Sequence, residues 1–247
     1  MSIFTPREDR KIICCGAVKK TRLSKNIKLC VWNMQKCKNK NWAGTFLRAA
    51  KKCDLFLGQE IKLSPGVKTS LEKTKMFWLL AVSFLSLAKR YPVGICVGAK
   101  AKPLEIKLER APKEPLVNIP KMAQAALYDT RASQLLVINL HVVNFKGIKA
   151  FEQNLELALR LFSEIKTPCI IAGDFNTWSK KRLSALKNFA NSLGLSEVKF
   201  EKDARSKYLR KPVDYIFVKG LAVKKSYVLK TDASDHNLLF AELELIS

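Results

Sequence analysis

Short apolar segments separated by amphipathic helical segments are the feature that most restricts how this chain can fold. Residues 27–32 alternate apolar and polar side chains, and residues 169–172 are continuously apolar, as expected for β-strands. Between such segments, residues 151–163 and 180–193 carry apolar side chains at the spacing of one helix face. Strands interleaved with helices indicate an α/β domain.

Further segments continue the same alternation. A helix is predicted near residues 42–50, and strands at residues 55–57, 76–88, 135–140, 213–218, 222–229 and 238–245. We interpret residues 1–25 as a basic N-terminal arm or edge strand, and residues 26–247 as one domain. The proline-containing residues 101–120 are expected to form surface loops within that domain.

The charge of the chain favours a polyanionic partner without selecting one. Lys and Arg number 45 against 21 Asp and Glu, which gives a net charge of +24. Such a balance attracts nucleic acid, anionic membranes or phosphorylated small molecules. The cations are spread along the whole chain, which equally suits a lysine-coated surface that keeps the protein soluble.

The cysteines and apolar segments indicate the expected cellular compartment of the protein. Seven cysteines, an odd number without metal-ligand spacing, are typical of a reducing compartment. Residues 12–18 are too short and too polar-flanked for a signal peptide, and residues 76–88 are too short for a membrane span. We therefore expect a soluble, cytoplasmic monomer without stable membrane insertion.

Polar side chains gather where the apolar strands end. They are Asn33, Gln59 and Glu60, His141, Asp174 and Asn176, and Asp235 and His236. Asp214 lies inside an apolar strand, where a carboxylate is costly unless it is paired. Strand ends deliver such side chains to a shared sheet edge, which is where α/β sites assemble. Both histidines of the chain belong to this set.

These motifs, in this order, resemble the endonuclease/exonuclease/phosphatase superfamily. The motifs are Val-Trp-Asn33, Gly-Gln-Glu60, Asn-Leu-His141, Ala-Gly-Asp174-Phe-Asn176, Val-Asp214-Tyr-Ile-Phe and Ser-Asp235-His236. Residues 141–145 and 173–179 also resemble the bacterial YafD-like branch. The resemblance implies a deoxyribonuclease I-like α/β sandwich of two mixed β-sheets flanked by helices, with the site at one end of the sheets.

The resemblance also implies a divalent cation. Glu60 would be the principal ligand of Mg²⁺ or Mn²⁺, with Asn33 and Asp235 helping to hold the ion. Taken singly, each has a structural alternative, because Asn33 could form a turn and Glu60 could be a surface carboxylate beside Lys62.

Catalytic roles follow for the remaining residues of the set. Asp174 would position or deprotonate the attacking water, and Asn176 would orient that water and the phosphate. Asp214 would accept a hydrogen bond from His236 and favour its protonated form. His141 would donate a hydrogen bond to a phosphate oxygen. The structural alternative for Asp174 and Asn176 is a turn before the next helix.

A nucleic acid is the favoured substrate. The segment that precedes Asp214 is basic and contains an aromatic side chain; its candidate contacts are Arg205, Lys207, Tyr208, Arg210 and Lys211. The alternative is a solvated loop. The chain is thus predicted to be a metal-dependent phosphodiesterase, most simply an endonuclease.

Other activities on the same core stay open. Met34 and Gln35 stand where abasic-site endonucleases carry an acidic residue, and the extended motifs of inositol 5-phosphatases are missing. A phospholipid or sphingomyelin phosphodiesterase, a small-molecule phosphatase of the inositol type, and a non-catalytic binding module are the alternatives. Phe77 and Trp78 are candidates for a membrane contact, although a buried strand explains them better.

Overall fold

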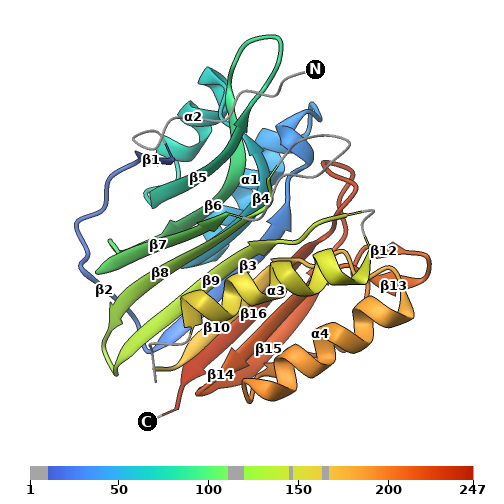
Figure 1. The fold of residues 1–247 in the computed structure, drawn as a ribbon. Coiled ribbons are helices and arrows are strands. Elements are labelled where there is room, and N and C mark those ends of the chain that lie inside the picture. Colours follow the sequence, from blue (N-terminus) through green and yellow to red (C-terminus); the bar gives the residue numbers. More distant parts are fainter. Residues whose placement is uncertain (1–10, 111–119, 145–146, 163–166, 247) are drawn as a thin grey trace.

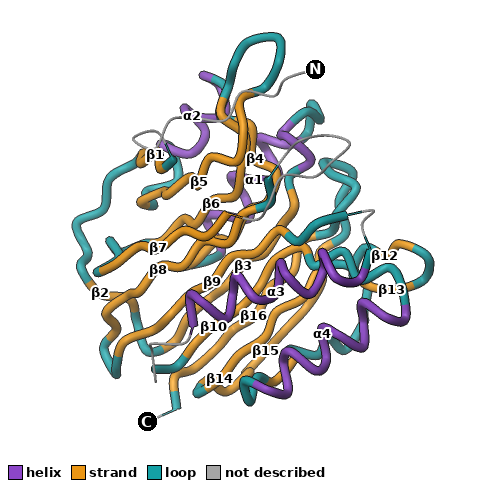
Figure 2. The backbone as a smooth tube through the Cα atoms, viewed as in Figure 1, coloured by secondary structure: helices purple, strands orange, loops and turns teal. Residues whose placement is uncertain are grey.

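A computed structural model describes residues 11–110, 120–144, 147–162 and 167–246. In this part of the chain the strands form two large mixed sheets that pack face to face, with helices on both outer faces (Figure 1). The predicted α/β sandwich of two mixed sheets flanked by helices is confirmed. Figure 2 shows the same layers, with the strands in orange and the helices in purple.

The first sheet has the strand order β1-β5-β6-β4-β3-β16-β15. Its strands are β1 (Ile12–Cys15), β3 (Asn26–Asn33), β4 (Leu55–Lys62), β5 (Phe77–Leu85), β6 (Pro92–Ala99), β15 (Leu221–Leu229) and β16 (Leu238–Leu245). β3 and β4 run parallel, whereas β16 pairs with β3 in the antiparallel sense. The carboxyl ends of β3 and β4 therefore lie at the same edge of the sheet.

The second sheet has the order β11-β14-β10-β9-β8-β2, and β7 also pairs with β8. Its strands are β2 (Arg22–Leu23), β7 (Glu105–Arg110), β8 (Met122–Thr130), β9 (Gln134–His141), β10 (Cys169–Asp174), β11 (Ser196–Glu197) and β14 (Asp214–Lys219). A separate small hairpin consists of β12 (Lys207–Tyr208) and β13 (Lys211–Pro212). The parallel pair β9 and β10 again brings two carboxyl ends together.

The helices cover the outer faces, and the starts of two of them follow from local sequence. They are α1 (Trp42–Lys52), α2 (Pro65–Glu72), α3 (Ile148–Phe162) and α4 (Lys180–Ser192), with a short turn at η2 (Gln35–Cys37). Ser64 and Ser179 cap α2 and α4, because each hydroxyl accepts a hydrogen bond from a backbone N–H in the first turn. α3 begins three residues before the predicted start, and the predicted end at Ser163 lies outside the described residues.

Alternation along β3 explains the layers. Leu29 and Val31 face the core between the sheets, whereas Cys30 and Trp32 face the core under α1 and α2. The second outer core lies between the other sheet and α3 and α4. From residue 29 to residue 32 the strand is buried on both faces and is continuously apolar, so the predicted alternation is limited to residues 27–29.

Several expectations need correction or completion. The predicted surface loop at residues 101–120 contains the strand β7, and residues 111–119 of it lie outside the described residues. Residues 12–15 form an edge strand of the first sheet, and residues 22–23 form one of the second, so the arm–domain boundary at residue 25 stays a prediction. Trp78 is completely buried in β5. Among the described helices, none is long and apolar enough to cross a membrane.

Candidate active site

The pairing register of the second sheet places three predicted catalytic residues in one row. Asp174, the last residue of β10, is paired with His141 of β9 on one side and with Asp214 of β14 on the other. Ala172 and Ile216 belong to the core between the sheets. Because side chains alternate along a strand, Asp174 and Asp214 also face the other sheet. The row therefore closes the inter-sheet core at the edge of the sandwich.

Asn33 reaches this row from the first sheet. As the last residue of β3, it continues the inner-face row of Leu29 and Val31. Its amide nitrogen donates a 3.0 Å hydrogen bond to Oδ2 of Asp174, and its amide oxygen accepts one of 3.0 Å from the backbone of Gln35. Asn33 thus joins the two sheets and orients the Asp174 carboxylate.

Glu60 is turned toward the site by a β-bulge. Leu57 faces the inner core, so simple alternation would point Glu60 to the opposite face. The pairing of β4 with β6 instead shifts between Gly58 and Ile61, and Glu60 has a φ of 51°. Its Oε1 atom consequently lies 3.8 Å from Nε2 of His141. A left-handed residue of this kind costs about 1 kcal/mol or more, and bulges commonly re-aim functional side chains.

His236 is held by Asp214 across the sheets. Nδ1 of His236 lies 2.8 Å from Oδ2 of Asp214, and both side chains are largely buried. The loop around His236 is fixed, because the Trp32 indole donates to the carbonyl of His236 at 2.9 Å and the Ser234 hydroxyl donates to that of Asn33 at 2.7 Å. Burial alone lowers the pKa of His236, but the charge and hydrogen bond of Asp214 raise it to about 10. His236 is therefore an imidazolium at neutral pH.

Lys121 belongs to the site although its sequence context gave no signal. It precedes Met122, the residue of β8 that pairs with His141, and its Nζ lies 3.0 Å from Nε2 of His141. Burial, and after it the charge of Lys121, lower the pKa of His141 well below its ordinary value. Because an ammonium group only donates, Nε2 of the neutral His141 accepts from Lys121. The proton of the neutral ring is then on Nδ1, so donation from Nε2 to a phosphate requires Lys121 to move and the ring to change tautomer.

Asp174 has the environment of a proton acceptor. Its Oδ1 accepts a 3.0 Å hydrogen bond from the backbone of Asn176, and its Oδ2 lies 3.6 Å from Nε2 of His141. Burial raises the pKa of Asp174; the charge of His236 works against this rise, and that of Asp214 adds to it. A carboxylate with a raised pKa is a stronger base than an ordinary one, so Asp174 is suited to accept a proton from water.

The turn after β10 depends on its backbone. Gly173 has a φ of 145°, and a Cβ there would lie 1.9 Å from the carbonyl oxygen of Leu140. Asn176 has a φ of 50°, and its side-chain amide donates to the carbonyl of Val142 at 3.0 Å. Asn176 therefore braces the turn, and its role toward water and phosphate stays a prediction.

The basic segment before Asp214 divides into a buried and an exposed part. Arg205 is 8% exposed; its guanidinium pairs with Asp203 at 2.8 Å and Glu197 at 3.1 Å, and it stacks on the ring of Tyr215 at 4.8 Å. It also donates to the carbonyl of Asp214 at 3.3 Å. Because the guanidinium is buried and bonded to these groups, it does not fit the substrate contact predicted for Arg205. The proposed substrate surface therefore does not include Arg205.

The exposed part is the hairpin of β12 and β13, which carries the exposed Lys207, Tyr208 and Arg210 and the half-buried Lys211. Leu209 and Arg210 both have positive φ, as in the tight two-residue turns that join antiparallel strands. The side chains of Tyr208 and Leu209 are 48% and 63% exposed. The backbone N–H of Asn237 donates to the Ser206 hydroxyl at 2.8 Å, which fixes the hairpin beside His236.

The donor set at the rim fits a hard divalent cation. Ligand atoms of Asp174, Asp214 and His236 lie within 4.8 Å of one another, but Nδ1 of His236 is already bound to Asp214. The carboxylates are therefore the better ligands. Oδ1 of Asp214 is buried and has no hydrogen-bond partner among the described residues, which is costly unless a further group offsets it. Glu60 adds a third carboxylate to this rim. Asp235, the other carboxylate predicted as a ligand, is exposed, and its Oδ1 lies 3.3 Å from the Ser234 hydroxyl.

Comparison with known proteins identifies the family. Residues 30–236 match the model of the endonuclease/exonuclease/phosphatase family. A UPF0294 protein of Yersinia enterocolitica is 33% identical over 221 residues, which cover 88% of this chain and 84% of that protein.

Solved structures agree on the fold. The human Nocturnin catalytic domain aligns with a TM-score of 0.71 at 18% identity, over 98% of this chain and 99% of that one. ANGEL2, described as a 2′,3′-cyclic phosphatase, aligns with a TM-score of 0.67 at 14% identity, over 88% and 95%. Together with the motifs and their geometry, the family match over most of its length shows that this chain belongs to the endonuclease/exonuclease/phosphatase family.

Proposed function

We propose that this chain is a divalent-cation-dependent phosphodiesterase that cleaves nucleic acid. The observation that carries the proposal is the closed arrangement at the sandwich rim, where a basic carboxylate, Asp174, lies beside an imidazolium, His236, and an ammonium group, Lys121. Membership in the family supports phosphoester hydrolysis as the reaction.

Each side chain has a role in this proposal. Glu60 would hold Mg²⁺ or Mn²⁺ together with Asn33 and Asp235, and the partnerless Oδ1 of Asp214 would be a further oxygen ligand, whereas Asp174 stays available as the base. The bound cation would supply charge that offsets the phosphoryl oxygens. Asp174 accepts the proton of the attacking water. His236, kept protonated by Asp214, donates to a phosphoryl oxygen.

The proposal assigns Lys121 the positive charge that the neutral His141 lacks. In the described structure Lys121 donates to His141. When a phosphate enters, the ammonium group would move to it, and the ring proton of His141 would shift from Nδ1 to the released Nε2, which could then donate the predicted hydrogen bond. Fixed charges in a partly buried site supply a large part of the rate of such reactions.

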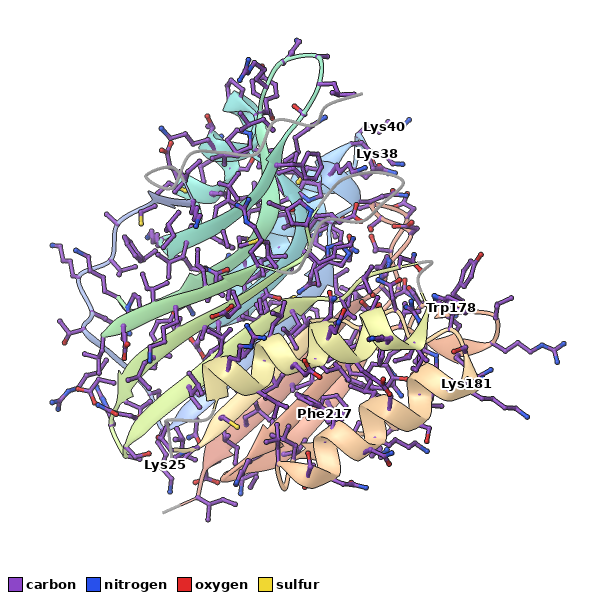
Figure 3. The ribbon with its side chains drawn as sticks, in the orientation of Figure 1. Lys25, Lys38, Lys40, Trp178, Lys181 and Phe217 are labelled. Atoms are coloured by element: carbon purple, nitrogen blue, oxygen red, sulfur yellow. The ribbon has the colours of Figure 1, made fainter. Side chains whose placement is uncertain are left out.

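The surroundings of the site favour a nucleic-acid substrate. The β12–β13 hairpin presents cations and the half-exposed ring of Tyr208 next to the His236 loop. Figure 3 shows Lys38, Lys40 and Lys181 projecting from the same end of the sandwich. Cations bind the phosphate backbone, and an aromatic ring stacks on bases of any sequence.

Cleavage of supercoiled plasmid and of single-stranded DNA and RNA, with Mg²⁺ or Mn²⁺, tests the proposal. Activity should disappear with EDTA and fall by several orders of magnitude in Asp174→Asn. Vesicles containing phospholipid or sphingomyelin and small phosphate esters are assayed in parallel. Intact nucleic acid together with lipid or small-ester turnover would keep the reaction and overturn the substrate.

The hairpin is tested through the salt dependence of nucleic-acid binding. The double variant Lys207→Ala/Lys211→Ala should reduce the slope of log affinity against log salt by about 1 to 2, since each phosphate contact contributes about 1. Lys51→Ala/Lys52→Ala is the charge-matched control, because these lysines end α1 at the start of β4, which is the opposite end of the sheet. Equal slopes in both variants would remove the hairpin from the substrate surface.

A further inference from the structure

Arg182 is a completely buried cation in the first turn of α4. Its relative exposure is 1%, and its guanidinium stacks on the rings of Phe151, at 5.0 Å, and Trp178, at 4.7 Å. The Ser179 hydroxyl that caps α4 accepts from the backbone N–H of Arg182 at 3.2 Å. Burying a charge is costly unless hydrogen bonds compensate it, so a guanidinium at this place calls for a structural reason.

The hydrogen bonds of Arg182 supply that reason. Nη1 donates to the carbonyl of Val143 at 2.8 Å and to the carbonyl of Asn176 at 2.9 Å. Val143 follows His141 by two residues, and Asn176 follows Asp174 by two residues. One nitrogen atom therefore joins the two segments that leave the catalytic row.

Further contacts in these two segments depend on the same alignment. The N–H of Val142 donates to the carbonyl of Asp174 at 2.9 Å, and the Asn176 amide donates to that of Val142 at 3.0 Å. The Trp178 indole, which stacks on Arg182, donates to the side chain of Asn144 at 3.0 Å. Asn176 is in the left-handed region, with a φ of 50°, so this turn needs support from its surroundings.

We propose that Arg182 is a positioning residue for the catalytic row. It fixes the turn after Asp174 against the segment after His141, and thereby sets the direction of both side chains. The inference deepens the proposed function and depends on it for its kinetic part. Since Arg182 is buried and does not reach the substrate, its removal acts on kcat and leaves KM and the cation requirement nearly unchanged.

Two substitutions test this role. Arg182→Met keeps the length and apolar contacts of the side chain, and Arg182→Lys keeps the charge but lacks the planar fork and its stacking. Lys187→Met, an exposed position on the same helix, is the matched control. In Arg182→Met we expect kcat to fall about 100-fold with KM changed less than about 3-fold, as for small misplacements of catalytic groups. Arg182→Lys should recover part of kcat.

Amide hydrogen exchange gives a readout that does not require activity. The amides of Val142 and Asn176, which donate to Asp174, should exchange at least about 10-fold faster in Arg182→Met, while amides in the centre of β3 and β16 keep their wild-type rates. If the wild type cleaves no phosphoester, the proposed function fails and the exchange result still decides whether Arg182 aligns the two segments.

Two results would overturn the inference. One is unchanged exchange at Val142 and Asn176 in Arg182→Met, together with unchanged kcat where activity exists. The other is a uniform increase of exchange across the whole sandwich, which would mean that Arg182 supports global stability only. If Arg182→Met fails to fold, the same two readouts in Arg182→Lys decide between these outcomes, with smaller changes expected.

Discussion

The Asp214–His236 pair gives a prediction with a magnitude that can be measured. The pKa of His236 is raised from 6.5 to about 10, and a difference of about 3.5 in pKa corresponds to about 5 kcal/mol of preference for the charged form. Asp214→Asn removes the carboxylate charge but keeps the burial, which by itself lowers the pKa. The pKa of His236 should therefore fall well below 10, while the charges of Asp174 and Asp235 still raise it.

NMR titration of the metal-free protein measures this directly, because the chain contains only two histidines. Between pH 5 and pH 9, His236 of the wild type should stay protonated, whereas in Asp214→Asn it should lose its proton within this range. His141 is the internal control and should stay neutral in both proteins. A wild-type His236 that titrates near 6.5, or the same titration in both proteins, would refute the reasoning.

The same pair predicts how stability depends on pH. A histidine with a raised pKa in the folded state stabilises the fold fully below its unfolded pKa, and this contribution is lost as the pH rises toward its folded pKa. Between pH 6.5 and pH 9 the free energy of unfolding of the wild type should fall by about 3 kcal/mol because of His236, since one proton changes this free energy by about 1.4 kcal/mol per pH unit. Asp214→Asn should lose less stability over this range, because its His236 has a lower pKa. Chemical denaturation of both proteins at the two pH values should therefore show a smaller difference in their free energies of unfolding at pH 9 than at pH 6.5. Parallel pH dependence would contradict the assignment.

Three further predictions concern the fold. Gly173→Ala should prevent β9 and β10 from pairing in register, because its Cβ would overlap the carbonyl of Leu140; loss of the cooperative thermal transition measures this, and a wild-type melting curve would contradict it. Phe46→Ala should destabilise the protein by about 3–5 kcal/mol in urea titration, because the ring is fully buried; a loss below about 1 kcal/mol would show that the core under α1 collapses around the cavity. Asp203→Asn should lower the free energy of unfolding by about 1 kcal/mol or less near neutral pH, as measured by urea titration. The hydrogen bond from Arg205 lowers the pKa of Asp203 below 3.8, so the wild type should lose this advantage as the pH falls through that lowered pKa. An advantage over the variant that does not shrink as the pH falls below 3.8 would refute the pairing.

The sequence predicted the strand ends of the site well because burial leaves a strong pattern there. Strands such as β3 and β10 are apolar on both faces, so a polar residue at the end of the run, Asn33 or Asp174, stands out in the sequence. His141 and Asp214 were recognised for the same reason, because each is a polar residue within or at the end of an apolar strand. The order of these motifs then identified the family.

The remaining features depend on pairing that no local pattern reveals. Lys121 becomes a site residue only because Met122 is in register with His141, and the strand that begins there was not predicted. Glu60 was identified from its motif, but the bulge that turns it inward comes from the shifted pairing of β4 with β6. Arg205 looked like an exposed cation because the sequence does not show that its side chain is buried and turned toward Asp203 and Glu197.

The site is assembled from both sheets, and this has a consequence for residues that never touch it. Hydrogen bonds cross from Asn33 to Asp174 and from His236 to Asp214, so the geometry of the centre reports the alignment of one sheet on the other. A small displacement of one sheet against the other would lengthen these two hydrogen bonds while the strand pairing within each sheet stayed intact. Apolar residues in the middle of the sandwich thus set the spacing of the rim side chains as well as the stability of the fold, and under the proposed function substitutions in that core would change turnover from a distance.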